Sequence, residues 1–88
     1  MVEQVQSNYD RFADVLYVSV GEPDGRAHSS EDESGLVWRY SSEGKCLGVT
    51  VRDFKFYWAE RLTELSQILS SKLHIAKTAA RSEIREYA

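Results

Sequence analysis

The sequence predicts an α+β domain, in which a small antiparallel meander of three to four strands has one face covered by a helix and a C-terminal helical segment follows. Two observations predict this class. Through residues 1–53, short runs alternate apolar and polar residues between turn residues, which is typical of strands. From residue 54 onward, apolar residues recur every three or four positions, which is typical of a helix with one apolar face. The 88 residues fit a single domain, residues 1–88.

The first clear strand is VLYVSV at residues 15–20, which is rich in β-branched and aromatic side chains. A further short strand is an option just before it, around residues 5–9. The next segment, residues 21–35, contains the single proline, three of the five glycines and an acidic run. We expect it to be largely loop, with residues 26–29 as an option for a polar edge strand.

A hairpin is predicted next, with strands at 36–41 and 46–52 and turn residues SSEGK between them. Side chains alternate between the two faces of a strand, so one face of this hairpin is strongly apolar and the other is mixed. The apolar face is predicted to carry Leu36, Trp38, Tyr40, Leu47, Val49 and Val51.

The helical part begins where the apolar period changes, and Asp53 is a plausible N-cap. A single helix over 54–87 would be about 50 Å long, which exceeds a domain of this size. We therefore prefer two helices, about 54–71 and 76–86, with a break near Ser70, Ser71 and the β-branched Ile75. The first helix is expected to bury a stripe formed by Phe54, Trp58, Leu62, Leu65, Leu69 and Leu73.

Composition limits the function classes. The net charge is −3, divided into −5 for residues 1–53 and +2 for residues 54–88. This division weakly favours an electrostatic partner or pairing between subunits. No apolar run approaches the roughly 20 residues that span a bilayer, so we expect no membrane segment. A single cysteine excludes an internal disulfide, and a reducing cytoplasm is the simplest location.

No constellation of residues in the chain predicts catalysis. Asp10 and Asp14 precede a strand, where an aspartate carboxylate that accepts hydrogen bonds from nearby backbone is a sufficient reason for them. Cys46 lacks a cysteine-enzyme signature, and His28 and His74 lack metal-ligand spacing. We therefore expect no enzyme activity and no metal or other cofactor.

Two stretches of the chain resemble a known family. YDRFADVLYVSV supplies Tyr9, Asp10, Ala13, Asp14, Leu16 and Tyr17 at the family's spacing, and GLVWRYSSEGKCLGVTV supplies Gly35, Val37, Gly44, Gly48 and Val49. The family is the domain of unknown function 2283, made of short bacterial, archaeal and phage proteins. Over roughly residues 7–53 the resemblance implies a small sheet-plus-helix fold. It implies no established activity and no site residues, and some members look like partners of toxin-like proteins encoded beside them. Tyr40-Ser41 stands where relatives often carry Tyr-Asp.

Protein binding is the predicted function, including self-association, with a dimer favoured. The expected surface joins two off-stripe aromatics to part of the apolar stripe: Phe56, Tyr57, Leu69, Leu73, Ala76 and Ile84. A concrete version is antitoxin-like, because the acidic run Glu31, Asp32 and Glu33 would suit a small basic toxin.

Nucleic-acid binding is the alternative function. Lys77, Arg81 and Arg85 stand four apart and form one stripe along a predicted helix. Such side chains make most backbone contacts to nucleic acids. The acidic whole chain counts against this interpretation.

Overall fold

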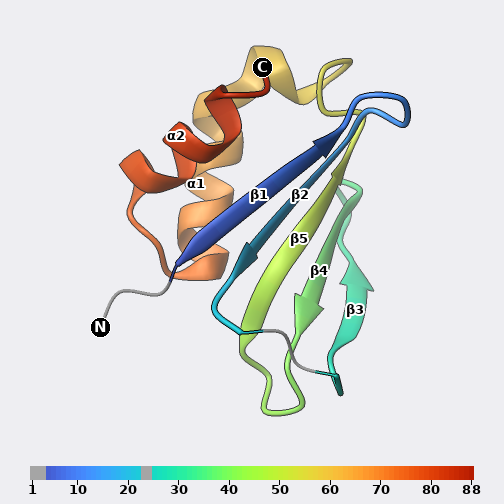
Figure 1. Cartoon of the computed structure of the whole chain (residues 1–88), viewed down its shortest axis with the longest axis vertical. Coiled ribbons are helices and arrows are strands. Elements are labelled where there is room, and N and C mark those ends of the chain that lie inside the picture. The colour runs from blue at the N-terminus through green and yellow to red at the C-terminus, as the bar shows by residue number, and fades with distance from the viewer. Residues whose placement is uncertain (1–3, 23–24) are drawn as a thin grey trace.

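A computed structural model describes residues 4–22 and 25–88. Five strands come first and helices follow (Figure 1). In chain order the elements are β1 (Val5–Asp10), β2 (Val15–Val20), β3 (His28–Glu31), β4 (Leu36–Tyr40), β5 (Cys46–Arg52), the 3-10 helix η1 (Trp58–Arg61), α1 (Leu62–Leu73) and α2 (Lys77–Arg85).

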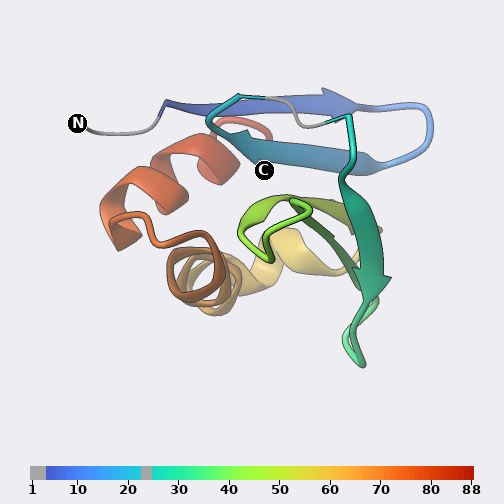
Figure 2. The ribbon, with the colours of Figure 1, turned by 90° about the horizontal axis from the view of Figure 1, so that it is seen from below.

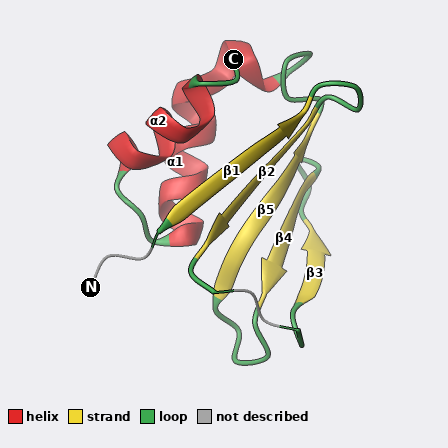
Figure 3. Cartoon of the chain, in the orientation of Figure 1, coloured by secondary structure: helices red, strands yellow, loops and turns green. Residues whose placement is uncertain are grey.

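The strands form one antiparallel sheet in the order β1-β2-β5-β4-β3 (Figure 3). The predicted α+β class is confirmed, with five strands in place of three to four. The order also differs from a continuous meander, because β2 pairs with β5 along their lengths. The sheet is therefore a β1-β2 hairpin joined edge to edge to a β3-β4-β5 unit.

Both helices lie on one side of the sheet, and Figure 2 shows the strong twist from β1 to β3. Their apolar stripes meet the alternating apolar positions of the strands, as the two periodicities predict. Helix α2 and the residues after it also bond to β1. The Ser7 hydroxyl donates to the Glu83 carboxylate of α2, and the Tyr87 hydroxyl donates to the Ser7 carbonyl at 3.2 Å. The fully buried large side chains include Leu16, Leu36, Trp38, Phe54, Leu65, Leu69 and Ile84.

A bulge changes which residues of β5 face the helices. Arg39 pairs with Gly48 and Tyr40 pairs with Cys46, so Leu47 is an extra residue opposite the β4 strand. Cys46 therefore joins the core cluster, although the simple alternation predicts Leu47 there. The edge strand β3 also starts two residues later than the option at residues 26–29, because His28 to Glu31 pair with β4.

The helical part starts later than predicted. Asp53 has a φ of 54°, and its carbonyl accepts the Tyr57 amide at 2.9 Å, so it belongs to a turn and is not the N-cap of α1. The first helix ends at Leu73, where His74 takes a left-handed conformation with φ 55°. Two helices are present, as preferred, and the break follows Leu73, within the stretch 70–75 where it was expected. Across residues 4–22 and 25–88, every helix falls short of the length and apolarity needed to cross a membrane.

Candidate interaction surface

Three loops meet at one end of the sheet, because β1, β3 and β5 finish there and β2 and β4 begin there. They are residues 11–14, 32–35 and 53–57 (Figure 1). We call these three loops the aromatic end. Loops held by a scaffold of strands are common positions for binding residues.

The aromatic end exposes large apolar side chains to solvent. Phe12 is 92% exposed, Phe56 is 88% exposed and Tyr57 is 43% exposed. The Tyr57 ring is nonetheless held in place, because it lies edge-on to Trp58 with ring centroids 4.9 Å apart and the Arg61 guanidinium lies 3.9 Å from its centroid. Clustered exposed aromatics are enriched at binding surfaces, so this end is the candidate site.

Asp14 ties two of these loops together. Its carboxylate accepts hydrogen bonds from the Lys55 amide at 2.8 Å, the Phe56 amide at 3.1 Å and the Tyr9 hydroxyl at 2.6 Å. Asp14 itself has a φ of 57°, a left-handed conformation that aspartate tolerates better than most residues. We call this arrangement the Asp14 clamp. It places Phe56 beside the loop that carries Phe12.

The clamp shifts two ionisation equilibria in opposite directions. Desolvation acts to raise the pKa of the Asp14 carboxyl, but the bonds from Tyr9 and from the Lys55 and Phe56 amides outweigh it and hold that pKa below its usual value. The hydrogen bond to Asp14, followed by desolvation, raises the pKa of Tyr9 to about 12. The structure therefore favours a charged Asp14 and a neutral Tyr9.

Asp10 holds the loop at residues 11–14 at the point where β1 ends. Its carboxylate accepts the Phe12 amide at 3.0 Å and the Ala13 amide at 3.2 Å. Asp10 therefore bonds to nearby backbone, as the sequence predicts, whereas the Asp14 carboxylate accepts backbone amides from a distant segment of the chain. Their joint effect is to hold the short turn that presents Phe12.

Asp32 organises the third loop. Its carboxylate accepts the Ser34 amide at 2.9 Å, the Leu36 amide at 3.0 Å and the Trp38 indole N–H at 2.8 Å. Desolvation opposes ionisation, but the Trp38 and backbone bonds prevail and lower the pKa of the Asp32 carboxyl. Asp32 is thus part of the β3–β4 turn, and its docking to a partner stays a prediction.

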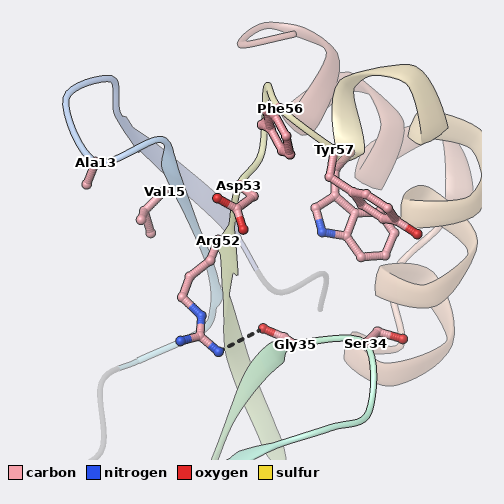
Figure 4. A pocket seen from close by; sticks show the side chains of 9 residues that line it. Ala13, Val15, Ser34, Gly35, Arg52, Asp53, Phe56 and Tyr57 are labelled. Atoms are coloured by element: carbon pink, nitrogen blue, oxygen red, sulfur yellow. Dashed lines mark hydrogen bonds between the residues drawn. The ribbon is translucent and has the colours of Figure 1, made fainter.

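A groove of about 410 Å³ opens between the three loops (Figure 4). Ala13 and Val15 line it from the first loop and strand, and Ser34 and Gly35 line it from the β3–β4 turn. Residues 52–53 and 56–58 complete the lining. Arg52 bridges two elements here, because its guanidinium lies 2.8 Å from the Glu31 carboxylate and 3.5 Å from the Gly35 carbonyl oxygen. The groove therefore combines apolar walls with a few polar groups, as binding sites commonly do.

The structure divides the predicted partner surface. Phe56 and Tyr57 are exposed at the aromatic end, and Ala76 is exposed just before α2. Leu69, Leu73 and Ile84 are at most 3% exposed, because α1 and α2 pack against each other and against the sheet. These three residues belong to the core, and the expectation that they extend the surface is corrected.

The remaining predicted residues stay at the surface. Glu31 and Glu33 are exposed, with Glu31 paired to Arg52. The basic residues of α2 are also exposed, and the Arg81 guanidinium donates to the Thr63 hydroxyl at 2.7 Å. The basic stripe at Lys77, Arg81 and Arg85 lies on the helical part of the chain, whereas the aromatic end is formed by loops of the sheet.

Phe12 was missed by the sequence analysis, although it is the most exposed of the four large exposed apolar residues in the described chain. A signal was present, because Phe12 stands in a turn between Asp10 and Asp14, outside the alternation of both neighbouring strands. An apolar residue fixed in a short polar turn has no strand face to occupy.

Cys46 is buried in the core cluster, and burial raises the pKa of its thiol. His28 stacks on Tyr40 with centroids 5.8 Å apart, and His74 ends α1. No hydrogen bond joins either histidine to Cys46 in the described part of the chain.

The fold and the surface define a small α+β domain with an aromatic-edged groove at one end of its sheet. The chain belongs to the family described as "protein of unknown function (DUF2283)", whose model matches residues 6–55. That match spans β1 to β5 and ends within loop 53–57. The resemblance is confirmed. Further comparisons with curated proteins and with solved structures found no match.

Proposed function

We propose that this chain is a non-enzymatic protein-interaction domain that binds its partner through the aromatic end. The observation that carries the proposal is the pair Phe12 and Phe56, each about nine-tenths exposed on neighbouring loops. Burying an exposed phenylalanine against a partner contributes favourable free energy on the order of 2 kcal/mol. The Asp14 clamp supports the same proposal, because a surface already held in its binding shape loses less conformational entropy on association.

An antitoxin-like role is one form of this function. It requires acidic groups that face a basic partner. Fewer than the three acidic residues of the run are available for that contact. Asp32 is committed to its turn and Glu31 to Arg52, so Glu33 is the exposed acidic group of the run without such a bond in the described structure. We therefore place the main contact on the aromatics, with Glu33 beside them.

Nucleic-acid binding through α2 is the second candidate. Lys77, Arg81 and Arg85 are all exposed, which this function requires. Binding of this kind weakens steeply as salt rises, because bound cations are released from the phosphates. Retardation of DNA or RNA at low salt, lost when all three residues become serine, would support it.

The decisive experiment is a tagged pull-down of the full chain from its source cell, with and without nuclease. The wild type is compared with Phe56→Ser, which removes the exposed ring and keeps the backbone amide that bonds to Asp14. Tyr17→Ser is the matched control, because the Tyr17 side chain is 42% exposed on β2 and does not line the groove.

A stoichiometric protein that survives nuclease, is retained by the control and is lost with Phe56→Ser is the expected result. Equal capture by wild type and Phe56→Ser would contradict the assignment of the surface. Loss of the bound material on nuclease treatment would favour the basic stripe instead.

A further inference from the structure

We propose that the aromatic end forms a two-fold contact with a second copy of this chain, in which Phe12 of each copy enters the groove of the other. This inference rests on the proposed function and names its partner. A two-fold interface uses the same patch on both subunits, so the patch must be complementary to itself. The aromatic end meets this requirement in both shape and charge.

The shape requirement is a projection and a hollow within one patch. Phe12 is the projection, because its side chain is 92% exposed and does not line the groove. Its chain neighbour Ala13 does line the groove, so the projection and the hollow are adjacent. Two copies related by a two-fold axis can therefore exchange their Phe12 rings reciprocally. Phe56 at the rim and Tyr57 in the wall offer aromatic surface to the incoming ring (Figure 4).

The charge requirement is met because opposite signs flank the groove. Arg11 is exposed next to Phe12, with its guanidinium 5.4 Å from the ring centroid, so the positive group accompanies the projection. On the side of the hollow, Glu33 is exposed next to the lining residue Ser34, and Asp53 lines the groove. The cation Arg52 also lines it, but its guanidinium is already paired with the Glu31 carboxylate. Entry of Phe12 brings Arg11 of one copy toward acidic groups of the other. A patch whose charges all had the same sign would repel the identical patch on the second copy.

The Asp14 clamp gives the contact its rigidity. The loop of Phe12 is held by Asp10 and the loop of Phe56 by Asp14, so projection and hollow keep a constant separation. A reciprocal contact needs this fixed separation, because the Phe12 ring of each copy must enter the groove of the other at the same time. An unrelated protein would need only the hollow or only the projection, which is why we assign a second copy as the occupant.

The test is sedimentation equilibrium of the full chain across roughly micromolar to millimolar concentrations. The variants are Phe12→Ser, Arg11→Glu, Glu33→Lys and the double variant with both charge reversals, and Tyr17→Ser is the control. We expect a wild-type dimer whose dissociation constant rises about 30-fold or more in Phe12→Ser, as for a central contact residue. Each single charge reversal should weaken the dimer, and the double variant should recover it. All substituted side chains are exposed, and urea unfolding of each variant checks that it folds.

A wild-type chain that stays monomeric throughout would overturn the inference, as would a dimer that Phe12→Ser and the charge reversals leave unchanged. The result is separable from that of the proposed function. A monomeric chain that still captures another protein in a Phe56-dependent way would refute the second copy and leave the interaction surface standing. If Phe56→Ser also leaves capture unchanged, both proposals fall.

Discussion

Replacing Asp14 with asparagine tests whether the clamp stabilises the aromatic end. Asparagine has the size of aspartate and also tolerates the left-handed conformation at this position, where φ is 57°. The substitution therefore removes the charge and one acceptor oxygen while the backbone keeps its geometry. The Tyr9 hydroxyl and the Lys55 and Phe56 amides would then face a weaker acceptor.

The expected loss is about 2 kcal/mol in the free energy of unfolding. Hydrogen bonds to a charged group contribute about 1.5–3 kcal/mol each, and neutral ones about 0.5–1.5 kcal/mol, so each of the three bonds weakens by roughly 1 kcal/mol. Asp14 is half-buried and both amides are on exposed residues, so water replaces part of what is lost. This lowers the total from about 3 to about 2 kcal/mol.

Urea unfolding measures this loss. With a slope of about 1–2 kcal/mol per molar for a chain of this size, the midpoint should fall by about 1–2 M at an unchanged slope. Asp53→Asn is the matched control, because Asp53 also has a left-handed φ, of 54°, and no hydrogen bond to its carboxylate is present among the described residues. Equal losses in Asp14→Asn and Asp53→Asn would refute the clamp.

Three further predictions concern titration and close packing. The Tyr9 phenol should ionise near pH 12 in absorbance titration, and Asp14→Asn should bring it back toward 10; a wild-type value near 10 would contradict the bond. The lowered pKa values of Asp14 and Asp32 mean that the folded state binds fewer protons, so their stabilisation is present above about pH 4 and is lost as pH falls further. Urea midpoints measured through that range should decline, and should decline less in Asp14→Asn. Gly48→Ala should cost about 2 kcal/mol, because its Cβ would lie 2.5 Å from a backbone oxygen of β2. Gly25→Ala, whose Cβ meets nothing within 4 Å, should change thermal stability by under about 0.5 kcal/mol.

The spacing of apolar residues predicted most of the fold, because each strand and each helix buries its own apolar face and so shows its own pattern in the sequence. VLYVSV became β2 with Leu16, Val18 and Val20 on its buried face, as alternation requires. The helical stripe likewise buried Leu65 and Leu69. The order of the strands was not predictable in the same way, since the β2–β5 pairing joins segments that are distant in the chain and carry similar patterns.

The candidate site was harder to predict because it depends on backbone conformations in the loops, which residue type alone does not determine. Asp53 reads as a helix cap by residue type, but its φ of 54° turns the chain and lets residues 55 and 56 reach the Asp14 carboxylate. The surface expected from the stripe was wrong for Leu69, Leu73 and Ile84, since α1 and α2 pack their apolar faces against each other and against the sheet.

The β2–β5 ladder has a consequence for how the chain folds. The β1-β2 hairpin and the β4-β5 hairpin each join neighbours in sequence, whereas β2 and β5 are separated by the whole of residues 21–45. Closing such a long loop costs entropy before any contact repays it, so non-local pairing slows folding. We expect the two hairpins to form early and their joining to limit the rate. The same joining brings Asp14 to Lys55, so loops 11–14 and 53–57 of the aromatic end come together only when β2 and β5 pair.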